Sequence, residues 1–299
     1  MSEPAATRYA PHLWMTAMIA IWGASYSVVK VALDVMPALT VVALRFWIAV
    51  VCMLPFVGRG ILAELRATRT AGLVAGTALL LGYELQMLGL QETSAATGGF
   101  LSGLIVLLAG LGGFVFFRAR FGPLSVAGFV LGLVGMSLLC WPVEAGADGV
   151  RDTPRGIALQ IGSSTAYAAH ILLLSRFGRG APALALCLWQ MLVTAVGSTA
   201  LAFATGDLGG ATFAAIDWSL GLVLALFYLG AFANALSVAV QGRVQHRIPP
   251  VHVALLFTTQ PLFAALFAWW WRGDQIGPWQ AGGGLLIVGA MLLTGLDRR

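Results

Sequence analysis

Ten hydrophobic stretches, each long enough to cross a lipid bilayer, occupy nearly the whole chain. They lie at about 13–32, 38–57, 70–90, 94–117, 123–142, 155–175, 182–204, 218–240, 251–271 and 278–296. A membrane-spanning helix needs about 20 mostly apolar residues. The chain is 59% hydrophobic and only 10% charged, whereas soluble domains carry about 25% charged residues. We therefore predict an all-α integral membrane protein with lipid as its solvent and no separate soluble domain.

The distribution of basic residues predicts how these spans are oriented. If the N-terminus lies inside the cell, twelve Lys and Arg residues fall in inner segments and four in outer segments. Such an excess is typical of cytoplasmic loops. Acidic residues such as Asp34, Glu92 and Asp274 fall in outer segments instead. We expect both termini inside, and we interpret the net charge of +5 as a topology signal that does not predict nucleic-acid binding.

The end of the second half resembles the end of the first half at a constant offset. Ala127, Gly128, Leu131, Val134, Gly135, Leu138 and Leu139 correspond to Ala281, Gly282, Leu285, Val288, Gly289, Leu292 and Leu293. Because five is odd, a repeated five-helix unit enters the bilayer from the opposite side, as in the inverted repeats of secondary transporters. We predict a first repeat at 1–142, an outer loop at 143–153 and a second repeat at 154–299. Chance agreement between two Gly/Leu-rich helices is the alternative.

Polar residues within the spans predict a central cavity between the two repeats. Such residues are costly in lipid and tend to face the bundle interior or a water-filled space. The spans 123–142 and 278–296 carry almost no polar side chains, so we place them at the periphery. The predicted substrate-binding residues are Trp22, Ser25, Tyr26, Tyr83, Glu84, Phe100, Ser163, Tyr167, Trp189, Asn234 and Gln260.

A few intramembrane residues have both a functional and a structural interpretation. Glu84 and His170 are candidates for proton coupling, and hydrogen-bonded structural roles are the alternative. Pro261 removes a backbone hydrogen bond, so we expect a helix break that exposes backbone to substrate, or a simple kink. Arg45 could bind a carboxylate or pair locally. Lys30 is expected to extend to the outer interface.

Catalytic readings are disfavoured by the spacing of the reactive residues. Ser163 and His170 share one predicted helix at a separation of about 10 Å, because each residue adds 1.5 Å. That is beyond hydrogen-bond reach for a nucleophile and its base. The four histidines are scattered, and no phosphate-cradling loop with a lysine is present. We expect no enzyme activity, no metal and no cofactor. A membrane scaffold is the other alternative, and it would not need polar faces on so many spans.

Several motifs together resemble the EamA-type drug/metabolite transporter superfamily. They are Trp22-Gly23-Ala24-Ser25-Tyr26, Ala43-Leu44-Arg45-Phe46, Thr97-Gly98-Gly99-Phe100-Leu101 and Gln260-Pro261-Leu262-Phe263-Ala264. The resemblance covers almost the full length and is greatest to bacterial aromatic amino-acid exporters. It implies a basket of helices around a central cavity, with the fifth and tenth spans at the rim. Where many relatives carry Gly-Glu after the ninth span, this chain has Arg272-Gly273-Asp274, which weakens any inference to a particular substrate.

These observations predict a secondary transporter of the inner membrane. We expect it to export aromatic and neutral amino acids and similar metabolites by alternating access, with the substrate and the lipid bilayer as its partners. Aromatic stacking would contribute about 0.5–1.5 kcal/mol beyond area burial. A cationic-drug exporter of the same fold, with Glu84 as its acid, is the alternative. A phosphate carrier would need more basic residues than Arg45 and Lys30. The sequence does not indicate an oligomeric state.

Overall fold

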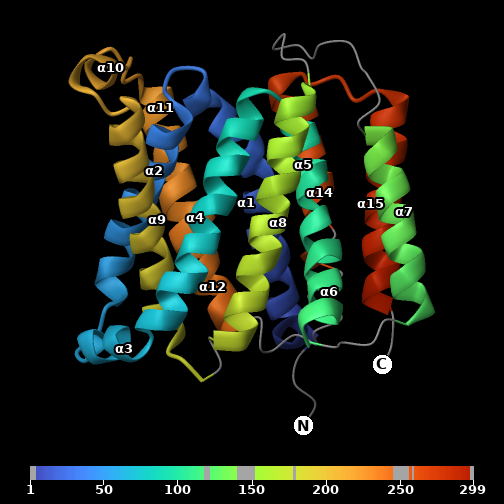
Figure 1. The fold of residues 1–299 in the computed structure, drawn as a ribbon, viewed down its shortest axis with the longest axis horizontal. Coiled ribbons are helices and arrows are strands. Elements are labelled where there is room, and N and C mark those ends of the chain that lie inside the picture. The colour runs from blue at the N-terminus through green and yellow to red at the C-terminus, as the bar shows by residue number, and fades with distance from the viewer. Residues whose placement is uncertain are drawn as a thin grey trace.

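The computed structural model describes residues 5–117, 122–139, 152–177, 180–244, 256–257 and 259–296. Within these ranges the regular elements are all helical, and the long helices run roughly side by side (Figure 1). Seven helical segments are long and apolar enough to cross a membrane: Ala10–Leu33, Ala38–Phe56, Arg69–Gln91, Ala95–Gly112, Pro154–Leu174, Ala183–Thr205 and Leu220–Val240. They coincide with seven of the ten predicted spans. Helices also cover most of the described parts of the other three predicted spans.

The first half of the chain begins with two long helices and ends with one at the edge of the bundle. Its helices are α1 (Ala5–Leu33), α2 (Ala38–Met53), the 3₁₀ turn η1 (Leu54–Phe56), α3 (Ile61–Ala67), α4 (Arg69–Gln91), α5 (Ala95–Ser102), α6 (Leu104–Phe117) and α7 (Pro123–Leu139). The predicted fourth span is thus two helices. The Ser102 hydroxyl donates to Gly99 O at 2.6 Å, and Gly103 N donates to Phe100 O in a tighter turn. Sequence analysis did not predict this interruption.

The second half also departs from regular α-helix within its spans. Its elements are α8 (Pro154–Phe177), α9 (Ala183–Thr205), α10 (Gly210–Ala214), α11 (Leu220–Phe227), the π-helix η2 (Tyr228–Leu236), α12 (Ser237–Val244), α14 (Gln260–Phe267), the π-helical turn η4 (Ala268–Arg272) and α15 (Pro278–Leu296). The predicted eighth span therefore contains a π-helix of nine residues. Such segments are rare and are frequently found at functional sites.

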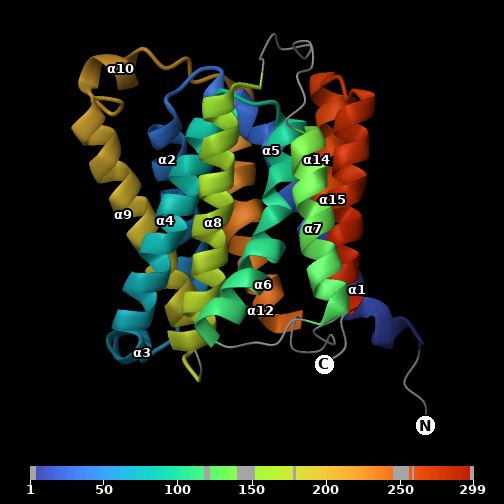
Figure 2. The same ribbon diagram turned by 45° about the vertical axis from the view of Figure 1, so that its right-hand side comes forward.

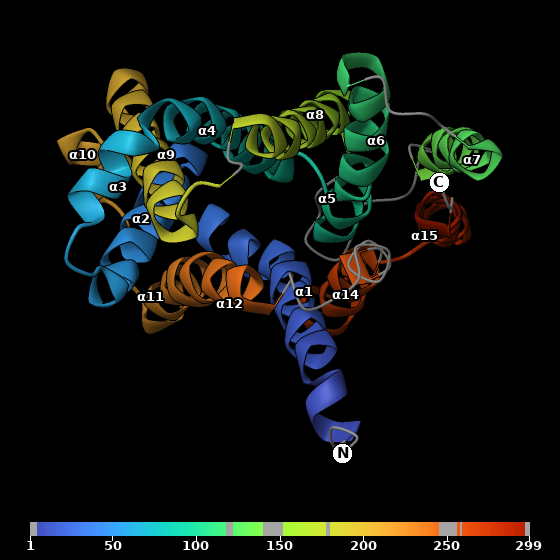
Figure 3. The same ribbon diagram turned by 90° about the horizontal axis from the view of Figure 1, so that it is seen from below.

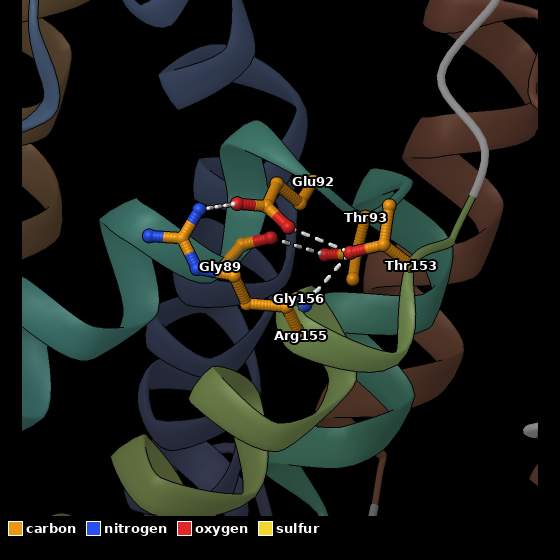
Figure 4. Close-up of polar contacts among 6 residues, drawn as sticks. All are labelled: Gly89, Glu92, Thr93, Thr153, Arg155 and Gly156. Atoms are coloured by element: carbon orange, nitrogen blue, oxygen red, sulfur yellow. Dashed lines mark hydrogen bonds and ion pairs between the residues drawn. The ribbon is translucent and has the colours of Figure 1, made fainter.

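The start of α8 shows why the chain turns where it does. The Thr153 hydroxyl accepts a hydrogen bond from Gly156 N at 2.9 Å, and Pro154 takes the first helical position, which has no need of an N–H. The same hydroxyl donates to Glu92 Oε2 at 2.7 Å, and Arg155 pairs with Glu92 Oε1 at 2.6 Å (Figure 4). Thr153, which caps α8, is thereby hydrogen-bonded to Glu92 at the end of α4.

Helices of the two halves alternate around the bundle. Seen from below, α4 and α8 lie opposite α1 and α12, with α2 and α9 on one side and α5 and α14 on the other (Figure 3). Helix α1 packs against α14, and α6 packs against α8. Helix α2 contacts η2 and α9, α4 contacts α8 and α9, and α5 contacts α14. Helices α7 and α15 pack on each other at one edge, at the opposite side of the bundle from α9 (Figure 2).

The outer surface of the described bundle is strongly apolar, as lipid contact requires. Trp269, Trp270 and Trp271 are exposed by 60%, 73% and 52%. A few charged residues are buried inside the bundle, and Lys30 is only 3% exposed. The expectation that Lys30 extends to the interface is therefore wrong, because neighbouring helices cover its side chain.

Candidate functional site

A cavity of about 620 Å³ lies among helices of both halves. Its lining comes from α1, α2, α4, the α5–α6 junction, α8, α9, η2, α12 and α14. A volume of this size lies within the usual range for small-molecule sites, about 300–1,000 Å³. Nine of the predicted site residues line it: Trp22, Ser25, Tyr26, Tyr83, Tyr167, His170, Asn234, Gln260 and Pro261.

The lining reaches closer to one end of the bundle than to the other. It includes Leu174 near the end of α8 and Cys187 near the start of α9. Along α8 and α9 the cavity thus extends toward the end of the bundle where α8 ends and α9 begins.

Three tyrosines and a glutamine form one hydrogen-bonded wall. Gln86 Nε2 donates to Tyr26 Oη at 2.9 Å, and Tyr167 Oη donates to Gln86 Oε1 at 3.3 Å. The rings of Tyr83 and Tyr167 meet edge to face at 5.4 Å between centroids. This wall offers flat aromatic surface together with neutral polar groups. Tyr26, Tyr83 and Tyr167 were predicted for the site; Gln86, which lies three residues after Tyr83, was not.

Arg45 is the main site residue that was left out of the predicted set. Its side chain is 3% exposed in this cavity, and Nη2 donates to Asn234 Oδ1 at 2.9 Å. Its guanidinium carbon lies 4.8 Å from the centre of the Tyr83 ring, close enough for a cation–π contact. The sequence did carry a signal, since a cation within a membrane span is costly and usually faces a cavity or a partner.

Two donor atoms of this pair have no partner within the described structure. They are Arg45 Nε and Asn234 Nδ2, and both atoms are buried. The Oδ1 atom of Asn234 is occupied, because it accepts from Arg45 and from Tyr83 Oη at 3.3 Å. Arg45 and His170 are the ionisable side chains other than tyrosine and cysteine in the described lining, which contains no Asp or Glu. The cavity wall therefore favours an anionic group over a cationic one.

Trp22 closes one side of the cavity between two irregular helices. Its Nε1 donates to Ala233 O, within the π-helix, at 2.7 Å, and its ring stacks on Phe257 at 5.8 Å. Helix α14 begins at Gln260, so Pro261 stands in its first turn, where the absent N–H costs little. The interruption thus falls at Thr259, whose N–H donates to Leu256 O at 3.0 Å.

Glu84 and Ser163 lie outside this lining although they were predicted for it. Glu84 is 5% exposed and accepts a hydrogen bond from Ser198 of α9. Ser163 is 2% exposed and donates to Gly82 O at 2.8 Å. Both side chains bridge α4 to a neighbouring helix. The carboxylate of Glu84 and the hydroxyl of Ser163 therefore stabilise helix packing and do not face the cavity.

Phe100 and Trp189 also lie outside the lining. Phe100 packs against Gly284 of α15. Trp189 packs against Gly72 of α4, and its Nε1 donates to Leu65 O at 2.8 Å. The residue next to Trp189 does line the cavity: Gln190 Oε1 lies 2.5 Å from His170 Nε2. Because Gln190 Oε1 can only accept, the His170 ring nitrogen donates in this contact.

The described residues contain no group of three or more His, Cys, Asp or Glu side chains that could hold a metal ion. Their arrangement can instead bind a small organic molecule through rings, amides and one guanidinium. Such a site has the chemistry of recognition rather than of bond making or breaking.

Comparison with known proteins gives a family and two relatives. The model of the EamA-like transporter family matches residues 10–141 and again residues 154–296. A protein of Archaeoglobus fulgidus named "Uncharacterized transporter" is 26% identical over 284 residues, which are 95% of this chain and 85% of that protein. A "Probable amino-acid metabolite efflux pump" of Salmonella typhimurium is 24% identical over 291 residues, 93% of this chain and 92% of its own length.

The fold is also found among solved structures. One of them, described only as "Crystal structure of protein", superposes with a TM-score of 0.69 at 20% sequence identity. The match covers 98% of this chain and 99% of the other. At this level of identity the likeness establishes a shared fold.

Proposed function

Because the chain belongs to the EamA-like transporter family, and is therefore a multi-pass membrane transporter and not an enzyme, we propose that it exports amino acids from the cell. Its substrates are aromatic and other neutral amino acids and similar small metabolites, moved across the inner membrane by alternating access around the central cavity. The name of the Salmonella relative is consistent with this substrate class.

The observation that carries this proposal is the composition of the cavity wall. Rings of Trp22, Tyr83 and Tyr167 present flat apolar surface to a side chain, and edge-to-face or stacked contacts suit an aromatic one. Ser25, Asn234 and Gln260 supply neutral hydrogen-bonding groups for the amino-acid backbone. The volume of about 620 Å³ leaves room for several neutral side chains.

A topology of ten spans in two inverted five-helix repeats is part of the same proposal, with repeats at 1–142 and 154–299. The two separate family matches support it. So do the helix contacts, which are repeated when each span is exchanged for its counterpart five spans later. The pairs α1–α14 and α6–α8 correspond, as do α2–η2 and α4–α9, while α2–α9, α5–α14 and α7–α15 map onto themselves. Helix α1 begins and α15 ends at the same end of the bundle, as an even number of spans requires (Figure 1).

The cationic-drug alternative loses its main support in this structure. It required a carboxylate at the site, and Glu84 bridges α4 to α9 outside the described lining. A phosphate carrier is disfavoured too, since Arg45 is the one Lys or Arg in that lining and phosphate recognition leans on such groups. Of the two candidates for proton coupling, only His170 faces the cavity.

The test is transport of a labelled amino-acid panel into proteoliposomes, with and without a pH gradient. We expect phenylalanine or tryptophan to be transported, and Tyr83→Ala and Tyr167→Ala each to reduce the rate about tenfold or more, because each removes ring contact and one hydrogen bond. Trp270→Ala, which alters a 73% exposed residue, serves as the control and should keep its rate. Folded protein that moves none of the amino acids would contradict the proposal. Loss of gradient sensitivity in His170→Gln would identify the coupling residue.

A further inference from the structure

Arg45 carries a buried positive charge that no carboxylate neutralises within the described structure. The Arg155–Glu92 and Arg272–Asp34 ion pairs both lie away from the cavity. Arg45 instead has the neutral Asn234 amide and the Tyr83 ring as its partners. Burying an uncompensated charge is expensive, so an anion that bound beside Arg45 would be strongly stabilised.

The unused donors beside Arg45 show what kind of anion fits. Arg45 Nε and Asn234 Nδ2 are buried and unpartnered within the described residues, while Nη2 of Arg45 and Oδ1 of Asn234 already contact each other. Two N–H groups from adjacent side chains are therefore free for acceptor oxygens. A carboxylate has two such oxygens and pairs well with a guanidinium.

The surrounding backbone holds this pair in place. Asn234 lies on the π-helix η2, which approaches α2 closely: a Cβ atom added at Gly230 would lie 2.7 Å from Arg45 O. The guanidinium is further held over the Tyr83 ring at 4.8 Å. Both side chains are already held in position before a ligand binds. Binding therefore costs less side-chain conformational entropy, which favours tight binding.

We infer that Arg45 and Asn234 form a carboxylate-binding subsite, so that the transported molecules carry a carboxylate and those that lack one are discriminated against. This inference rests on the proposed transport function and deepens it by assigning the charged end of the substrate to the Arg45–Asn234 side of the cavity. The Tyr83 ring, which touches Arg45, then lies where a substrate side chain begins.

The decisive experiment compares L-phenylalanine with L-phenylalaninamide, which has the same ring and amine but no carboxylate. In wild-type proteoliposomes we expect unlabelled phenylalanine to inhibit phenylalanine transport at least about tenfold more strongly than the amide, because a hydrogen bond to a charged group is lost with the amide. Arg45→Gln should reduce phenylalanine transport and bring this ratio close to one, while Arg45→Lys, which keeps the charge, should restore part of it. If Arg45 had a purely structural role, Arg45→Gln would lower phenylalanine transport but leave the ratio of the two inhibition strengths unchanged.

Failure of this inference can be told apart from failure of the transport function. If phenylalanine is transported but the amide competes equally well in wild type, the carboxylate subsite is overturned and the exporter proposal stands; this arm needs no variant to fold. If no amino acid is transported, stabilisation of the purified wild-type protein by 3-phenylpropionate, which has a carboxylate and no amine, still tests the subsite. Stabilisation that is absent in Arg45→Gln would support it, and no stabilisation of wild type would overturn it.

Discussion

At the scale of single residues, neighbouring polar side chains in one span serve different purposes. Tyr83 faces the cavity, whereas Glu84 hydrogen-bonds to Ser198 of another helix. With 3.6 residues per turn, the side chain of the next residue points about 100° further around the helix. A residue's polarity therefore indicates that it faces away from lipid, and its rotation decides between cavity and helix contact.

Close backbone approach at Gly99 gives a prediction at this scale. A Cβ added to Gly99 of α5 would lie 2.2 Å from the Ala264 Cβ of α14. Gly99→Ala should therefore destabilise the protein by about 1–3 kcal/mol through overpacking. Gly282→Ala, where a Cβ meets nothing within 4 Å, gains the same helix propensity without the clash. A melting temperature in detergent that falls only for Gly99→Ala is the expected result, and equal values for both variants would contradict it.

At the scale of elements, local hydrogen bonds set where the helices begin and where they are interrupted. The α5–α6 junction and the π-helix η2 both lie inside predicted spans. Hydropathy cannot reveal them, because apolar residues continue across both interruptions. The two irregular segments carry Ser102, Gly103 and Asn234 of the cavity lining, so the irregular backbone supplies part of the site.

The hydrogen bonds that cap α8 predict how two substitutions at its start change the stability of the protein. Thr153→Ala removes both the cap to Gly156 N and the bond to Glu92, and should cost about 0.5–2 kcal/mol. Arg155→Gln breaks an ion pair whose arginine side chain is 76% exposed, and should cost about 0–1 kcal/mol. The melting temperatures of the two variants in detergent measure this difference. A larger loss in Arg155→Gln would show that the ion pair, and not the cap, joins α8 to α4.

At the scale of the whole molecule, the cavity extends toward one end of the bundle, which the proposed topology places inside the cell. Leu174 lines this part of it. Introduced into a cysteine-free background, Leu174→Cys should react with a membrane-impermeant thiol reagent in inside-out vesicles and be protected by phenylalanine. Asp217→Cys, at an exposed position in a predicted outer segment, is the control and should react in right-side-out vesicles. Reaction of Leu174→Cys from the outside alone would reverse the assignment.

The family, the membrane class and much of the candidate site could be predicted from the sequence, each from a different signal. The EamA resemblance is confirmed by the family match over both halves. Trp22, Tyr83, Tyr167 and Asn234 line the cavity as expected, since intramembrane polar and aromatic residues gather at functional surfaces. Arg45 was considered and set aside, because a buried arginine that pairs locally looks the same in a sequence.

The sequence by itself determined that the solvent of this protein is lipid and that its chain is divided into apolar segments of spanning length. Both follow from residue-by-residue transfer energies and from the length of a helix that satisfies its own backbone. Only the tertiary structure decided which side chains share the cavity, because that depends on the rotation of each helix against its neighbours. This is why Ser163 and Glu84 bridge helices, and why Arg45 meets Asn234 across a distance of 189 residues in the chain.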